Sequence, residues 1–544
     1  MKTKRLLLPL ILASIAVFSA TGCSNKQKAG GASTIQIKSY KGGYGTDWLH
    51  EMADKFKTIH PEISFEFVEE SALVTNEKVQ GEIALPKKNQ IDLYFVTGLD
   101  VDALLQKSYS ALKKRDVVLL EPLDDVFQSK AIGLDGKEES TTIQSRFFDG
   151  FEELCKYNGS FPKWRNNMFF LPWADASTGL FVNKSVLDKY NVEIPLTSNE
   201  LINAVQTIYT NGKSQGNYPF SWAGNNAYGY WEYLYETWFA QYSGAEAFNR
   251  FMNCDPGNGK IVEEGYKVFQ DQGILKALEA MFDICDLKYS PNGSTSKTHM
   301  EAQTEFVTGK TAFMCDGDWL LNEMKRDYFD QSKEIMMIGA PILSSIGTEI
   351  GITDAELHTL VENIDVHKSN SEIKTVFPSL TDANIERVRS ARSLHDTLGI
   401  GHTVAIPSYA DAKDAAKLFL RFMYSNDGCR IFRNYAYSNL PLSYVSDASD
   451  SNTTFQKSLD RVRDYERPQI ITSTAPFNGV RSIAFIYLFN YSSWVHPYTF
   501  MNIMIDKASS NPSFTNKGPQ YLFEYEQEYV KGQWSQYMTY INYL

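Results

Sequence analysis

Two hydrophobic periods alternate just after position 33, and this alternation limits the fold more than any other feature of the chain. Thr34–Tyr40 has the period-two pattern of a strand, and Ile63, Phe65 and Phe67 repeat it. A helical stripe separates the two strands and ends before Pro61. Its members are Trp48, Leu49, Met52, Ala53, Phe56 and Ile59. Strand, helix and strand in this order form a β-α-β unit, so we expect an α/β fold with a partly parallel sheet.

Later segments repeat this pattern over a chain too long for one core. Residues 91–96, 311–315 and 399–407 are typical of strands that lead into a loop and then a helix. A chain of 544 residues exceeds what a single hydrophobic core organises, so two or more domains are expected. Open α/β sheets bind ligands at the carboxyl ends of their strands, where these loops lie.

The N-terminal segment has the composition of an export signal. Lys2, Lys4 and Arg5 precede an apolar run over 6–20, which Pro9 interrupts and which is short for a membrane span. Small residues then precede Cys23, a pattern that resembles a bacterial lipobox, in which this cysteine is lipidated. We therefore predict a lipoprotein signal peptide over 1–22 and a flexible tether over 23–33. The alternative is a simple secretory signal that happens to end near Cys23.

Charge and cysteine content exclude several classes of protein. The chain has 53 Lys and Arg against 65 Asp and Glu, a net charge of −12, which argues against a nucleic-acid partner. Of its 6 cysteines, the five beyond Cys23 include no CxxC pair, so neither a disulfide framework nor a metal cluster is predicted. We expect no cofactor.

Four motifs resemble those of one known family. They are Lys41-Gly-Gly-Tyr-Gly-Thr-Asp-Trp48, Leu171-Pro-Trp173 followed by Asn183-Lys184, Phe306-x-x-Gly-Lys-x-Ala-Phe-Met314 with Gly317-Asp-Trp319, and Val404-Ala-Ile-Pro407. In order and spacing they resemble the bacterial extracellular solute-binding proteins of family 1, sugar-binding lipoproteins that serve ABC importers. The resemblance covers about residues 34–430.

The resemblance implies a two-lobed, periplasmic-binding-protein-like clamshell, in which each lobe is a mostly parallel sheet flanked by helices. We expect 34–172 plus 396–430 to form lobe 1, and 173–343 plus 431–544 to form lobe 2. The polar segment 344–395 is predicted to be an insertion, and the sequence does not indicate to which lobe it belongs. Hinges are expected near 171–173 and 340–343, with another crossing after about residue 430.

A sugar ligand needs flat apolar surfaces against its C–H faces and planar polar groups for its hydroxyls. Loops at predicted strand ends supply both kinds of side chain. The candidate ligand-binding residues are Tyr44, Asp47, Trp173, Asp175, Trp222, Asn225, Asn226, Tyr228, Trp231, Asp318 and Trp319. Taken singly, a Trp can be core packing, Asp47 a helix-start charge, and Asn225 and Asn226 turn residues.

The function that the resemblance implies is capture of a sugar or oligosaccharide, delivered to the permease subunits of an ABC importer at the extracytoplasmic face of the cell membrane. Two alternatives stay open: a surface-anchored carbohydrate hydrolase using carboxylates such as Asp316 and Asp318, and an adhesive lipoprotein without a transport role. Enzymatic motifs are incomplete. The helix that contains His50 and Glu51 has Asp54 where a zinc protease needs histidine, and Thr304 replaces the first glycine of a phosphate loop. We therefore expect a binding protein and not an enzyme.

Overall fold

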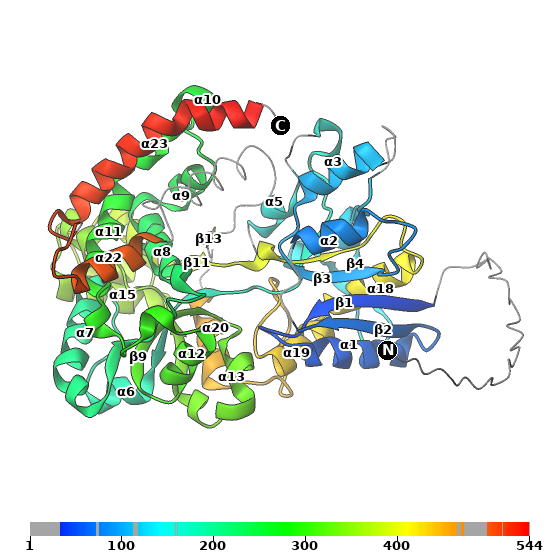
Figure 1. Ribbon diagram of the computed structural model, residues 1–544. Coiled ribbons are helices and arrows are strands. Elements are labelled where there is room, and N and C mark those ends of the chain that lie inside the picture. Colours follow the sequence, from blue (N-terminus) through cyan, green and yellow to red (C-terminus); the bar gives the residue numbers. More distant parts are fainter. Residues whose placement is uncertain are drawn as a thin grey trace, which may run out of the picture.

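The computed structural model describes residues 33–71, 76–111, 118–148, 150–157, 159, 161–464, 469–472, 498–513 and 515–542. The expected signal peptide 1–22, Cys23 and residues 24–32 of the expected tether lie outside this part. Two α/β lobes lie side by side, a first lobe that begins with the blue strands and a second lobe that contains most of the green helices (Figure 1).

The first lobe is built on a five-stranded sheet of order β2-β1-β3-β12-β6. Its strands are β1 (Thr34–Tyr40), β2 (Ser64–Glu70), β3 (Leu93–Thr97), β6 (Leu171–Pro172) and β12 (His402–Ala405). The expected β-α-β unit is present, because β1 pairs in parallel with β2 and α1 connects them. The helices are α1 (Asp47–Ile59), α2 (Asn76–Ile83), α3 (Val101–Ala111), α4 (Asp124–Gln128), α5 (Phe151–Cys155), α18 (Lys413–Met423) and α19 (Asn426–Ala436), and β4 (Lys130–Ile132) pairs with β5 (Glu138–Thr142).

The second lobe is built on a four-stranded sheet of order β10-β7-β9-β8. Its strands are β7 (Thr178–Asn183), β8 (Tyr218–Phe220), β9 (Thr311–Gly317) and β10 (Ile335–Ile338). Its helices are α6 (Lys184–Lys189), α7 (Ser198–Gly212), α8 (Glu232–Ser243), α9 (Ala245–Met252), α10 (Ile261–Glu264), α11 (Gln272–Ile284), α12 (His299–Val307), α13 (Leu320–Tyr328), α14 (Ser344–Glu349), α15 (Asp354–Asp365), α16 (Asn370–Val376), α17 (Asp382–Arg392), α20 (Thr454–Val462), α22 (Tyr498–Ala508) and α23 (Gly518–Asn542). β11 (Leu394–Asp396) and β13 (Gln469–Ile471) pair in parallel.

Each sheet is mostly parallel, as expected, and contains one reversed strand. β12 is antiparallel to β3 and β6, and β7 is antiparallel to β9 and β10. The reason is that the chain enters each sheet from the other lobe. β12 begins at His402 opposite the end of β3 at Thr97, and β7 begins at Thr178 opposite the end of β9 at Gly317. A strand that starts at the lobe junction runs against one that ends there.

The hydrophobic cores show where the later segments pack. The helices of the polar segment 344–395 belong to the core of the second lobe, through Ile346, Leu357, Leu360, Ile385 and Val388. The stretch just beyond residue 430 differs from its expected place in lobe 2. Phe432, Ala436, Leu440 and Leu442 lie in the first core, because α19 packs on α1.

The chain crosses between the lobes at about 173–177, 397–401 and 437–453. The second crossing lies after the helices α14–α17 and not at 340–343 as expected, because those helices stay on the second lobe. Within the described ranges, no helix combines the length and the apolar composition needed to cross a bilayer. The five described cysteines are free and buried.

Candidate ligand site at the lobe junction

Three aromatic residues that follow strands meet where the chain crosses between the lobes. Tyr44 follows β1, Trp173 follows β6 and Trp319 follows β9. The Tyr44 ring packs edge-on against Trp173 at 5.6 Å between centroids and against Trp319 at 6.3 Å. His402, the first residue of β12, lies 5.4 Å from the Tyr44 ring and 6.2 Å from the Trp319 ring. Trp319 is carried by the second lobe, yet it is only 8% exposed and belongs to the core of the first.

Hydrogen bonds join the loop after β1 to the second lobe beside these rings. The Tyr44 hydroxyl donates to Asp318, and the Gly43 N–H donates to Glu323 Oε1 at 3.2 Å. Asn322 Nδ2 donates to the Gly43 carbonyl at 2.5 Å. Gly43 has a φ of +61°, which glycine adopts without steric cost, so the loop can turn closely over α13. The two lobes are therefore in direct polar contact at this point.

Asp175 is the buried anion of the junction. Its Oδ2 accepts from Ser177 Oγ at 2.6 Å, from Arg463 Nη1 at 3.2 Å and lies 3.2 Å from His395 Nε2. Burial opposes ionisation of this carboxyl most strongly, but the charges of Arg463 and His395 and the hydrogen bonds from His395 and Ser177 together outweigh burial and lower the Asp175 pKa to about 2. Asp175 is therefore charged at neutral pH and ties the first crossing to the residue that follows α20.

Two other buried carboxyls at the end of β9 behave in the opposite way. Burial raises the pKa of Asp318 to about 7, and the nearby Asp175 charge adds to this shift. Burial, followed by the charge of Glu323, raises the pKa of Asp316 to about 8. Asp318 Oδ2 accepts from Ser438 Oγ at 2.6 Å, and Gln303 Nε2 donates to Asp316 at 3.0 Å. A protonated carboxyl donates one hydrogen bond, so this end of the junction can offer both donors and acceptors.

Some of the buried polar atoms without a hydrogen-bond partner in the described structure lie at the first crossing, on the segment that follows β8, on α12 and on β11. They include Asp175 Oδ1, Trp222 Nε1, Trp231 Nε1, Glu236 Oε2, Gln303 Oε1 and Asp396 Oδ1. Burial raises the pKa of Glu236, and the Asp396 charge adds to this shift. Each such group costs about 1–3 kcal/mol when it stays unpaired, so a polyhydroxylated ligand that reached them would gain from pairing them.

The structure brings together only some of the predicted site residues. One cluster contains Tyr44, Trp173, Asp318 and Trp319, and the charge of Asp175 acts on Asp318 in this cluster. Among the other candidates, those whose side chains are described lie apart from this cluster.

Trp222 and Trp231 are buried in the core of the second lobe. Asn225 donates its N–H to the Lys297 carbonyl, and Asn226 accepts from the N–H of His299, the first residue of α12. The Asp47 side chain is 75% exposed and 3.9 Å from Lys325. Tyr228 begins a short 3-10 helix, but its side chain lies outside the described part.

Sequence reasoning missed several polar residues of the junction. Asn322 and Glu323 lie one helical turn after Trp319, and this spacing could have indicated that they share its face. His402 opens the strand that the fourth motif predicted, so its position was also accessible. Arg463 gave no signal, because 288 residues separate it from Asp175.

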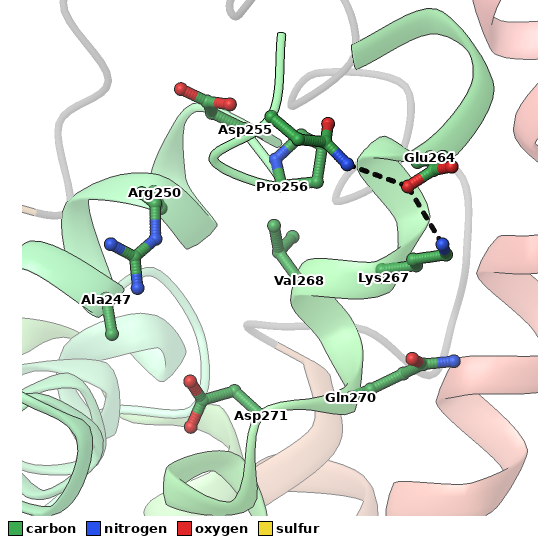
Figure 2. A pocket seen from close by; sticks show the side chains of 10 residues that line it. Ala247, Arg250, Asp255, Pro256, Glu264, Lys267, Val268, Gln270 and Asp271 are labelled. Carbon is green, nitrogen blue, oxygen red and sulfur yellow. Dashed lines mark hydrogen bonds and ion pairs between the residues drawn. The ribbon is translucent and has the colours of Figure 1, made fainter. Parts of the chain in front are cut away.

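A separate pocket of about 390 Å³ lies on the second lobe, between α9 and the segment before α11 (Figure 2). Its charged side chains are largely paired. Glu264 accepts from Lys267 at 2.8 Å and from Asn258 at 2.9 Å, and Arg250 donates to Glu246 at 2.5 Å. None of the predicted site residues lines this pocket.

The chain has two α/β lobes joined by several crossings, and aromatic and carboxyl side chains lie at these crossings. This architecture is that of the two-lobed binding proteins. The chain belongs to the bacterial extracellular solute-binding proteins, whose family model matches residues 42–428.

Solved structures support the fold. The apo form of RafE from Streptococcus pneumoniae has a TM-score of 0.54 at 12% identity, covering 93% of this chain and 100% of that chain. RafE in complex with raffinose has a TM-score of 0.51 at 13% identity and the same coverage. Maltose-bound MalE3 of T. maritima has a TM-score of 0.51 at 14% identity, covering 92% and 99%. No relative was found among curated protein sequences.

Proposed function

We propose that this protein is an extracytoplasmic lipoprotein that captures a sugar or oligosaccharide between its two lobes and delivers it to an ABC importer. The observation that carries the proposal is the junction itself, where three aromatic rings from both lobes lie beside buried carboxyls. Aromatic faces suit the C–H faces of a sugar, and carboxyl and amide groups suit its hydroxyls. The sugar-bound RafE and MalE3 structures share the fold.

From the cores in which their described residues pack, the lobes are proposed to comprise 34–172 with 402–442, and 178–396 with 454–464 and 498–542. Ligand closes them only if it binds the closed arrangement better than the open one. Small-angle scattering with and without a saturating oligosaccharide tests this closure. An unchanged radius of gyration would contradict it.

The membrane anchor is proposed on Cys23. Its support is the sequence pattern of a charged start, an apolar run and small residues before one cysteine. Stable attachment needs more than one acyl chain. Mass spectrometry of membrane-extracted protein should detect a diacylglyceryl group on Cys23, and an unmodified chain that starts elsewhere would rule it out.

Trp319 is proposed as the stacking platform for a sugar ring. Covering roughly 100 Å² of apolar surface is worth about 2.5 kcal/mol. Trp319→Ala should therefore weaken sugar binding roughly fifty- to a hundredfold in calorimetric titration.

Trp164→Ala is the control, because Trp164 is half-buried against the first core and lies outside the aromatic cluster. Thermal melting of both variants separates loss of binding from loss of folding. A folded Trp319→Ala protein that binds sugar normally would contradict the platform role.

A further inference from the structure

A cavity of about 680 Å³ lies between the lobes on the side of Arg463, and its volume is that of a small-molecule site. One wall belongs to the first lobe, where Leu442 lies in the core and Phe148 packs against it. The other wall is α20, which packs on β10 of the second lobe. An occupant would thus contact both lobes at once.

The cavity is cationic although the chain has a net charge of −12. Its lining contains the four cationic residues Arg433, Lys457, Arg461 and Arg463 against two carboxylates, Asp460 and Asp464. Asp460 is paired with Arg433, whose Nη1 and Nη2 donate to the two carboxylate oxygens at 2.9 and 2.8 Å.

Three of the cationic side chains have capacity left for an anion. Lys457 and Arg461 are exposed at i and i+4 of α20, and within the described ranges neither side chain has an ion-pair or hydrogen-bond partner. Like charges at this spacing repel each other, so a shared anion would relieve the repulsion. The Arg463 side chain is 9% exposed, and its Nε–H is buried without a partner among the described residues.

The rest of the lining suits a ring with hydroxyls better than a bare ion. Phe148 and half-buried Tyr444 offer aromatic surface, and the Arg463 guanidinium lies 5.0 Å from the Phe148 ring centroid. Asn439 and Asn452 supply amide groups. A planar guanidinium fork also matches the geometry of a carboxylate.

From this combination we propose that the cavity binds the carboxylate-bearing ring of an anionic saccharide, a uronate-type sugar. The inference rests on the proposed function and names the class of its ligand. The carboxylate lies among Lys457, Arg461 and Arg463, and the ring lies against Phe148 and Tyr444. Because Arg463 also pairs with Asp175, the occupant is coupled to the first crossing between the lobes.

The test is calorimetric titration of the full chain with three probes: trigalacturonate, its fully methyl-esterified form and maltotriose. Trigalacturonate should bind at least tenfold more tightly than the ester, and added salt should weaken its binding. Arg461→Gln and Lys457→Gln should each weaken trigalacturonate binding tenfold or more. The matched controls Arg326→Gln and Lys333→Gln change exposed cations on and beside α13 and should leave it unchanged.

The outcomes separate this inference from the function on which it rests. Equal binding of acid and ester, unaffected by Arg461→Gln, would overturn the uronate assignment and leave the sugar-binding proposal intact. Acetate that binds as tightly as trigalacturonate would overturn the saccharide assignment of the cavity. Failure of all three probes and of a wider sugar panel would overturn both proposals.

Discussion

Asp175 and Asp318 lie on neighbouring segments of the lobe junction, both fully buried, yet their protonation differs at neutral pH. The Asp175 pKa is lowered to about 2 and the Asp318 pKa is raised to about 7. Burial acts on both carboxyls in the same direction. What differs is the neighbouring charge, since Asp175 lies beside Arg463 and His395, and Asp318 lies beside the Asp175 anion. Arg463, together with His395 and the hydrogen bonds to the carboxyl, thus keeps Asp175 charged although burial opposes its ionisation.

The largest expected change in stability comes from removing the Arg463 cation. Arg463→Met should lower the free energy of unfolding by about 3–5 kcal/mol at pH 7, because Asp175 would stay buried without its guanidinium partner. Urea denaturation followed by circular dichroism measures the loss. Arg461→Met, two residues earlier and exposed, should change the stability by less than about 0.5 kcal/mol. Equal losses in both variants would contradict the role of the pair.

The second expected effect is a pH dependence of the stability that Asp318 causes. The Asp318 pKa is about 7 in the folded protein against about 3.9 in the unfolded chain, so its stabilisation is complete below pH 4 and is lost as pH rises through 7. Asp318→Asn keeps an acceptor for Tyr44 and removes this titration. Between pH 5 and pH 8 the wild type should therefore lose about 2–3 kcal/mol more stability than the variant.

Denaturation curves at the two pH values give this difference. Asp316 also has a raised pKa, so the variant retains some pH dependence of its own. Parallel curves for wild type and variant would show that Asp318 is ionised in the fold.

The smallest expected changes in stability come from removing the serine hydroxyl that donates to each of the two carboxyls. Ser177→Ala removes a donor at 2.6 Å from the charged Asp175 and should cost about 2 kcal/mol at pH 5. Ser438→Ala removes a donor at 2.6 Å from the protonated Asp318 and should cost about 1 kcal/mol at the same pH. Thermal melting ranks the two variants. The reverse order would mean that the charges are assigned the wrong way round.

Much of the fold could be predicted because it depends on local patterns. The period-two and helical stripes after residue 33 predicted the β1-α1-β2 unit, and strand ends predicted the positions of Tyr44, Trp173 and Trp319 near one another. Ligand contact by these residues stays a prediction.

The features that could not be predicted from the sequence depend on long-range packing. Trp222 and Trp319 both follow strands, but the first packs into the core of its own lobe and the second into that of the other. No local period distinguishes these cases. The same holds for the pairing of Arg463 with Asp175, and for the direction of β12, which depends on the lobe from which the chain arrives.

The position of Trp319 gives the protein an optical reporter of its own state. Its indole is attached to one lobe and buried in the other, so the lobes cannot separate without moving it into water. Tryptophan emission shifts to longer wavelength when the indole becomes solvated. The fluorescence of the unlabelled protein should therefore follow opening and closing directly, and the Trp319→Phe variant should lose that signal.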